Sequence, residues 1–318
     1  MPTVTYNLST KIKLTISEIE RTRVKILLYP LPFEKENKLK WEADISRAYW
    51  SLVITGNKLN RKRIASLLSS PFSYKTQSTE ERDILRYRQA LEYIYYNWYG
   101  SDKSLNYNVV AYLYKIACQP TDTIKFVSTR AKTDLIKTLE YLNRSNEHPI
   151  IQAGIALMQM RTLSPFENYN GIVSRLVSQL YLYKGGYDFR GLLILDEFWH
   201  KDMDNYRRLV NTARQTQNLT NWLEYYIEAI NIQLVKALNN MRSSRSHEWI
   251  DNHFWSLNER QKEILSMLKD PTATLTNRRV QRIFKISQIT ASRDLSKLAK
   301  LRLLLSHSKG RSTFYTKV

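Results

Sequence analysis

Glycine and proline are scarce in this chain, and that scarcity constrains the fold more than any other feature. The 318 residues include 8 glycines and 8 prolines, whereas average usage of about 7% would give roughly 22 glycines. Both residues mark turns and interrupt regular structure. Apolar residues account for 43% of the chain and aromatic residues for 12%, more than a disordered chain contains. We therefore predict a mostly all-α folded protein, with about two domains at roughly 150 residues each.

Cysteine, histidine and hydropathy exclude several classes of protein. The chain has one cysteine, Cys118, and five histidines. One cysteine cannot form an intramolecular disulfide, and the histidines lack the spacing of zinc ligands. The longest uncharged stretch, residues 148–160, is shorter than the roughly 18–20 residues of a membrane span, and the N-terminus lacks the apolar segment of a signal peptide. We expect a cytoplasmic protein with no metal and no membrane partner.

Positive charge is concentrated at the C-terminal end. The whole chain has a formal net charge of +20. Residues 257–318 contain 14 Lys and Arg against 4 Asp and Glu, a net charge of +10 in the last fifth of the chain. A surface selected only for solubility mixes both signs. This imbalance favours a polyanionic partner.

The same region shows a compact pattern of elements. Apolar spacing predicts a helix from about Leu257 that ends at Asp270-Pro271, and a second helix capped by Thr276 or Asn277. A third helix is expected to begin near Ser287. We expect it to turn four apolar side chains inward: Ile289, Leu295, Leu298 and Leu301. Two strands, 303–305 and 313–315, follow as a hairpin.

Residues 287–298 match the pattern S-x-x-T-x-x-R-D-L-x-x-L and resemble the recognition helix of winged helix-turn-helix DNA-binding domains. The resemblance covers about the last 60 residues, although Leu301-Arg302-Leu303 replaces the usual glycine after the helix. It implies a helix that enters the major groove of duplex DNA. Winged helices also serve as dimer or protein-docking modules. The predicted DNA-binding residues are Arg278, Arg279, Arg282, Gln288, Thr290, Ser292, Arg293, Lys297, Lys309 and Arg311.

Residues 164–175, Ser-Pro-Phe-Glu-Asn-Tyr-Asn-Gly-Ile-Val-Ser-Arg, resemble the motif of the Fic family, H-P-F-x-(D/E)-G-N-G-R-x-x-R. Residues 51–57 resemble its inhibitory-helix signature, S-x-x-I-E-G-N, and segments 192–206 and 222–226 resemble two later family segments. The resemblance spans roughly residues 40–235, and a C-terminal winged helix is a common companion in this family. We predict a Fic-like helical domain over residues 1–245, with its core at about 85–235, and a winged helix with a β-hairpin wing over 246–318.

The family resemblance implies chemistry that this chain has largely lost. Fic proteins transfer AMP from ATP to protein hydroxyls, with the motif histidine as general base and the motif acid holding Mg²⁺. Here Ser164 stands at the histidine position, and losing a positioned base typically costs about 10²–10⁴-fold. Asn168 stands at the acid position and is a weaker ligand for a hard cation. Ile172 replaces the first phosphate-binding arginine, and Tyr169 replaces the glycine before Asn170.

Some motif positions survive. Asn170, Gly171 and Arg175 are candidates for anion or nucleotide binding at a helix N-terminus, whereas the other interpretation makes Asn170 a helix cap and Arg175 a buried tie. The inhibitory-motif positions are Ser51, Thr55 and Gly56. Thr55 stands where the family has a glutamate that pairs with the last motif arginine.

Our hypothesis is a Fic-like protein that has lost AMP transfer and acts as a DNA-binding regulator. The alternative is an active adenylyltransferase with a different residue set, which would need ATP and Mg²⁺ and a carboxylate such as Glu167 in its pocket. A third interpretation is an adaptor in which both domains bind proteins. Under the first hypothesis no cofactor is expected, duplex DNA is the partner, and a protein partner and a homodimer both stay open.

Overall fold

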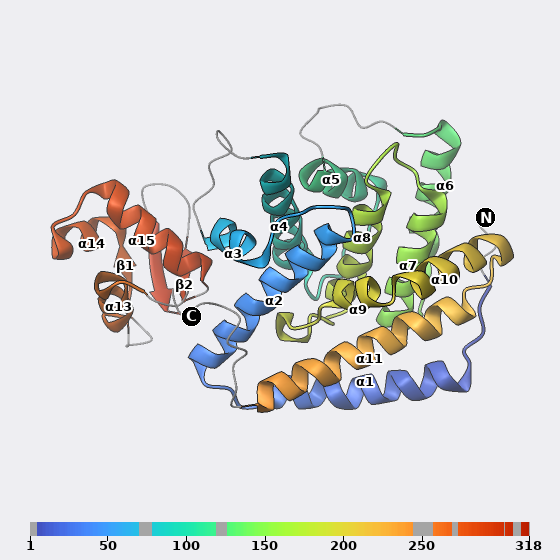
Figure 1. Ribbon diagram of the computed structural model, residues 1–318, viewed down its shortest axis with the longest axis horizontal. Helices are drawn as coiled ribbons and strands as arrows, with labels where there is room; N and C mark the ends of the chain where they lie inside the picture. Colours follow the sequence, from blue (N-terminus) through green and yellow to red (C-terminus); the bar gives the residue numbers. More distant parts are fainter. Residues whose placement is uncertain are drawn as a thin grey trace.

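The computed structural model describes residues 5–69, 78–118, 126–243, 257–268, 273–301, 303–307 and 313–317. Its described residues are mostly helical with one small antiparallel sheet near the C-terminus (Figure 1), which confirms the predicted fold class. The helices of the N-terminal body are α1 (Thr10–Leu28), α2 (Phe33–Val53), α3 (Arg61–Ser69), α4 (Thr79–Trp98), α5 (Tyr107–Cys118), α6 (Thr129–Arg144), α7 (Pro149–Leu163), α8 (Asn170–Lys184), the short η1 (Phe189–Gly191), α9 (Leu195–Lys201), α10 (Met203–Thr216) and α11 (Thr220–Arg242).

Helix α7 lies at the centre of this body and packs along α8. Its start is well specified, because Pro149 occupies the first turn and the His148 Nδ1 accepts a hydrogen bond from the Ile150 N–H at 3.3 Å. Every residue from Ile150 to Met160 except Gln152 is buried. Gly154 permits the close approach of α11, since a Cβ there would lie 2.9 Å from both the Leu223 Cδ2 and the Tyr226 Cδ1. The connection between α7 and α8 carries the motif.

The remaining helices surround this pair. Helices α4 and α5 pack on α8, whereas α6, α10 and α11 pack on α7. Helix α1 runs beside α11 in the same direction (Figure 1), tied by the Ser9 Oγ donating to the Glu224 Oε1 at 2.6 Å and by a bridge between Thr5 and Asn218. Helix α2 contacts α3, α4 and α9, which places its C-terminal end beside α8.

The C-terminal unit has the predicted order of three helices followed by a hairpin. It consists of α13 (Glu259–Ser266), β1 (Leu275–Thr276), α14 (Asn277–Phe284), α15 (Gln288–Lys300), β2 (Leu304–His307) and β3 (Phe314–Lys317). Strand β3 pairs with β2 and with β1. The sequence pattern did not predict β1, because this strand is only two residues long. Asn258, Thr276 and Ser287 each cap the following helix by accepting a backbone N–H. The C-terminal part of the unit contacts the body through α15 and α3.

One predicted core position is wrong. Ile289 was expected to point inward but is 64% exposed, and Ala291 is buried in that turn instead. Ile289 and Leu298 are nine residues apart on α15. At about 3.6 residues per turn, that separation puts them on opposite sides of the helix. The predicted domain boundary at 245/246 lies outside the described residues. Among the helices described, none has the length and apolar character needed to cross a bilayer.

Candidate functional site

The motif loop, residues 164–169, retains the backbone shape that a glycine would favour. Ser164 ends α7 with φ 41° and Tyr169 precedes α8 with φ 62°, both in the left-handed region. The Asn170 side chain closes this loop: its Oδ1 accepts the Phe166 N–H at 3.0 Å and its Nδ2 donates to the Phe166 carbonyl at 2.6 Å. The helix-cap interpretation of Asn170 is wrong, because the cap position is Tyr169 and Asn170 fastens the loop.

Aromatic packing holds the loop in place. The Phe166 ring is fully buried and stacks on Tyr114 with centroids 4.3 Å apart. The Val127 N–H donates to the Pro165 carbonyl at 3.0 Å. This hydrogen bond holds the chain at Val127 against the loop. Tyr169 is 42% exposed and its ring is not buried in the loop. The carboxylate considered for an active enzyme, Glu167, is exposed, as is Asn168.

Ser164 and Ile172 both make contacts within the protein. The Ser164 Oγ donates to the Arg161 carbonyl at 2.9 Å, so its hydroxyl proton is used within the end of α7. Ile172 is 5% exposed and packs in the core. An arginine at that position would have to leave the core or bury its charge, which is costly.

Arg161, which the motif pattern did not identify, lies beside the first turn of α8, and a second such arginine, Arg214, lies beside the end of α7. A Cβ added to Gly171 would lie 3.1 Å from the Arg161 Nη1 and 3.5 Å from the Arg175 Nη1. Arg214 donates to the Arg161 carbonyl, and its Nη2 lies 3.5 Å from the Ser164 Oγ. Burial, together with the nearby charge of Arg161, lowers the pKa of Arg214. Positive charge and free N–H groups at a helix start together favour an anion.

Arg175 is held in the core through its Nε and Nη2, and only its Nη1 faces Gly171. It is 7% exposed, its Nε lies 2.6 Å from the Asp196 Oδ1, and its Nη2 donates to the Ser51 carbonyl at 2.8 Å. This is the arrangement of the buried-tie interpretation. Burial raises the pKa of Asp196, although the charge of Arg175 opposes that shift. Asp196 was missed because it is distant in sequence and belongs to no motif position considered.

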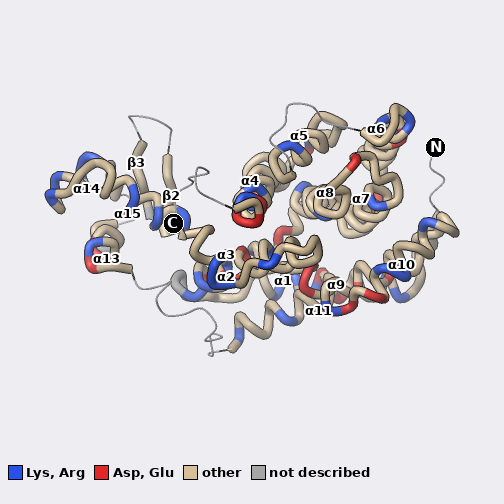
Figure 2. The backbone as a smooth tube through the Cα atoms, turned by 45° about the horizontal axis from the view of Figure 1, so that its top comes forward, with Lys and Arg blue, Asp and Glu red and all other residues tan. Residues whose placement is uncertain are grey.

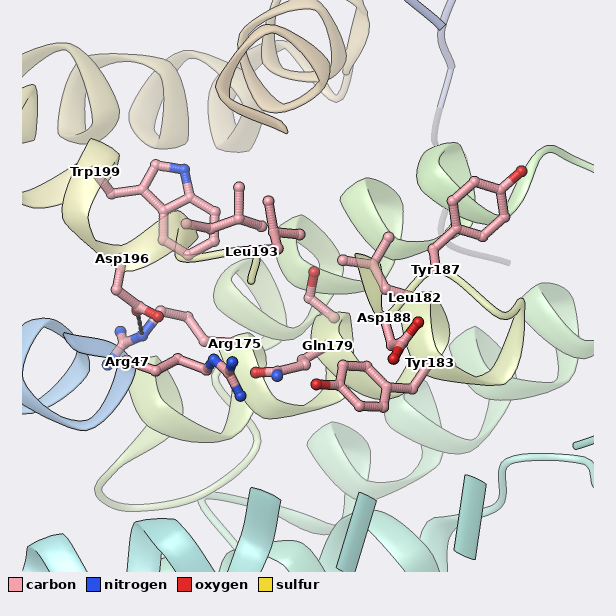
Figure 3. Close-up of a pocket in the computed structure, with 12 residues that line it drawn as sticks. Arg47, Arg175, Gln179, Leu182, Tyr183, Tyr187, Asp188, Leu193, Asp196 and Trp199 are labelled. Carbon is pink, nitrogen blue, oxygen red and sulfur yellow. Dashed lines mark ion pairs between the residues drawn. The ribbon is translucent and has the colours of Figure 1, made fainter. Parts of the chain in front are cut away.

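A second buried arginine, Arg47, lies beside this ion pair (Figure 3). It extends from α2, is 5% exposed, pairs with Asp44 at 3.4 Å and donates to the Gly191 carbonyl at 2.5 Å. A cavity of about 30 Å³ lies between Arg47, Arg175 and the α8–α9 segment. The contacts of Arg47 with Gly191 and of Arg175 with Ser51 and Asp196 join α2, α8, η1 and α9 around this cavity.

Of the inhibitory-motif positions, Ser51 contacts the motif arginine, whereas Thr55 and Gly56 lie in an exposed turn after α2. Ser51 is fully buried and binds Arg175. Thr55 lies beyond the end of α2, where its Oγ1 donates to the Leu52 carbonyl at 2.8 Å, and Gly56 follows with φ 91°. Thr55 therefore bonds within its own turn, and Asp196 supplies the carboxylate that pairs with Arg175.

The structure leaves most predicted DNA-binding residues exposed. The exposed ones are Arg278, Arg279, Arg282, Gln288, Ser292 and Arg293. Thr290 shares its hydroxyl with the Ser287 Oγ at 3.0 Å, and Lys297 donates to the Gln261 Oε1 at 3.2 Å. Lys309 and Arg311 lie outside the described residues.

The buried acid of α15 orients this helix. Asp294 is 4% exposed, its Oδ2 lies 2.5 Å from the Arg260 Nε, and its Oδ1 accepts from the Gln261 Nε2 at 2.7 Å. Both partners belong to α13, so the pair fixes which side of α15 faces out. Across the described ranges, no group of three His, Cys, Asp or Glu side chains is placed to hold a metal ion.

The fold is that of solved Fic proteins. A Fic family protein from Desulfovibrio desulfuricans G20 superposes with TM-score 0.64 at 14% identity, covering 98% of this chain and 97% of that one. A Fic-1 fragment (aa134 - 508) from C. elegans gives TM-score 0.57 at 16% identity over 73% of each chain. A Fic domain containing signaling protein from Bacteroides thetaiotaomicron VPI-5482 gives 0.57 at 14% identity, covering 75% of this chain and all of that one.

The sequence comparisons return no match, either to a protein-family model or to a curated protein. At these identities the likeness establishes the fold alone. The expected resemblance to the Fic family is thus confirmed at the level of the fold: this chain has the Fic fold.

Proposed function

We propose that this chain is a divergent Fic protein that does not transfer AMP and acts as a DNA-binding regulator. It binds duplex DNA through its C-terminal unit, residues 257–317. The observation that carries the proposal is the charge of α14 and α15. Residues 273–301 contain seven Lys and Arg and one acid, Asp294. That acid is buried and paired with Arg260, so it does not offset the outward charge.

The exposed cations lie where a duplex can reach them. Figure 2 shows Lys and Arg along α14 and α15, at the end of the molecule away from the centre of the helical body. Arg278, Arg279, Arg282 and Arg293 are exposed. Phosphate contacts by such side chains release counterions and supply most of the sequence-independent affinity for DNA.

The motif supports the loss of transfer chemistry. Ser164 lacks the basicity of an imidazole, Asn168 is a poor Mg²⁺ ligand, and Ile172 is buried. The surviving arginine, Arg175, is held by Asp196 and Ser51. Each of the four groups that would position or activate ATP is thus replaced or engaged elsewhere.

Fluorescence anisotropy with a labelled 30-base-pair duplex tests the DNA-binding proposal. We expect binding by the full chain at low salt and a loss of about tenfold or more on the triple change Arg278→Ala, Arg279→Ala and Arg282→Ala. The matched control removes three exposed charges from α6, by Arg130→Ala, Lys137→Ala and Arg144→Ala. Equal effects of the two variants would mean that only total charge matters and would contradict a site on α14.

A second candidate function is binding of a phosphorylated small molecule at the first turn of α8. The observation that favours it is the approach of Arg161 to Gly171, with the buried Arg161 Nε–H having no hydrogen-bond partner in the part of the chain described. Calorimetric titration with ATP, with and without Mg²⁺, tests it. Binding that is lost on Arg161→Ala supports this candidate, and no heat at millimolar ATP removes it.

A further inference from the structure

The outward face of α15 exposes an isoleucine near its N-terminal end. Ile289 is 64% exposed in the first turn, and Ser292 and Arg293, three and four residues later, are also exposed. At about 3.6 residues per turn these three side chains share one side of the helix. That side lies opposite Leu298, which is fully buried. We call Ile289, Ser292 and Arg293 the α15 stripe.

Two other polar residues of α15 are engaged within the protein. Thr290 bonds to Ser287, and Lys297 bonds to Gln261 on α13. Because Asp294 ties the opposite side of the helix to Arg260, the helix cannot rotate to hide Ile289. A partner that approaches α15 from outside therefore meets the α15 stripe, together with the exposed Gln288 at the start of the helix.

The chemistry of the stripe matches base edges in a major groove. Thymine presents an apolar C5-methyl group there, and guanine presents two acceptors that an arginine binds in bidentate fashion. A serine between the two long side chains allows the helix backbone to come close to the bases. The exposed cations of the neighbouring helix α14, Arg278, Arg279 and Arg282, favour a polyanion over an apolar protein surface. Two copies of a chain with net charge +20 also repel each other.

We propose that Ile289 reads the methyl group of a thymine in the major groove, with Arg293 contacting a base one helical turn further along. This proposal rests on the proposed DNA binding and adds a sequence preference to it. Side chains at i and i+4 are about 5–6 Å apart, and bases rise by about 3.4 Å per step. The two contacts should therefore fall about one to two base pairs apart.

Selection from a random duplex pool with the full chain, followed by thymine-to-uracil replacement at each position of the selected site, tests the proposal. Uracil lacks the methyl group. We expect one thymine whose replacement weakens binding by the wild-type chain about fourfold, and no such effect for Ile289→Ser. In Arg293→Ala the uracil effect should persist while overall affinity falls. Because Ile289 is exposed, Ile289→Ser should melt at the wild-type temperature.

The outcomes separate the two proposals. A selected site at which uracil acts equally on the wild type and on Ile289→Ser overturns the thymine contact and leaves DNA binding intact. Binding without any selected sequence also overturns it. No binding at low salt overturns the proposed function and this inference together. A change in molar mass of Ile289→Ser by light scattering would assign the stripe to a contact between copies and contradict the proposal.

Discussion

The Arg175 guanidinium and the Asp196 carboxylate form a buried ion pair, with the Nε 2.6 Å from the Oδ1 and both side chains less than a tenth exposed. The pair joins the end of the motif on α8 to the start of α9, and Ser51 adds α2 to the same cluster. Arg175, the last arginine of the Fic-like motif, thus joins three helices in the core of the protein.

Removing one member of this pair should be strongly destabilising. We expect Asp196→Ala to lower the free energy of unfolding by about 3–5 kcal/mol, because Arg175 would keep a buried charge without its partner. Urea denaturation followed by circular dichroism measures the loss. The control is Asp204→Ala on α10, which is exposed and should change stability by less than about 0.5 kcal/mol. Equal effects would show that the ion pair is energetically unimportant.

Stability should fall in acid through Glu197. Burial alone would raise the pKa of Glu197, but hydrogen bonds and charge from Lys201 and Lys236 hold it below its ordinary value. A carboxyl group with a lowered pKa contributes stability above its unfolded value, and that contribution is lost as the pH falls through the folded value. We expect thermal denaturation to show a steeper loss below about pH 4.5 in the wild type than in Glu197→Gln. Parallel curves for the two proteins would exclude this contribution.

Two substitutions at Tyr169 distinguish the cost of its left-handed backbone from the contribution of its side-chain contacts. At φ 62° a β-branched residue is sterically worse than tyrosine, and glycine is better. Tyr169→Val should therefore lower the free energy of unfolding by about 1–2 kcal/mol, whereas Tyr169→Gly should stay within about 1 kcal/mol of the wild type. Urea midpoints compare the two. If glycine is the more damaging change, the edge-on contact between the Tyr169 and Tyr114 rings, with centroids 6.5 Å apart, outweighs backbone strain.

The motif substitutions predict an inert catalyst. Incubation with ATP and Mg²⁺ should add no AMP to the chain or to a protein acceptor, by intact-mass spectrometry. Ser164→His should not change this, because a general base acts only when phosphates and metal are already positioned near it, and Arg175 stays bound to Asp196. A mass increase of one AMP in Ser164→His would mean that the loop is still competent and that the loss of transfer is a matter of one residue.

Local signals in the sequence predicted local structure well. The sequence predicts one helix from about Leu257 and another near Ser287, and α13 and α15 begin there, capped by Asn258 and Ser287. A capping residue acts on its own helix, so this signal is local. The apolar character of Ile289 predicts an inward side chain, but the buried Leu298 lies nine residues later and therefore on the opposite side of the helix. Strand β1 escaped prediction, since two residues carry no period.

The site was less predictable, for a physical reason. Arg175 meets Asp196, and Arg161 meets Arg214, through tertiary packing of helices that are far apart in the chain. No spacing rule within one element reports such pairs. The motif identified which positions matter, whereas the partners of those positions depend on how α2, α8, α9 and α10 pack.

The central claim is that the C-terminal unit binds duplex DNA, and the salt dependence of the affinity tests it most directly. Each phosphate contact should contribute about −0.9 to the slope of log K against log salt. We expect a steep negative slope for the full chain, reduced by about 2.7 in the triple change of Arg278, Arg279 and Arg282 to alanine if each contacts one phosphate. A flat slope, or no detectable binding at 50 mM salt, would contradict the claim.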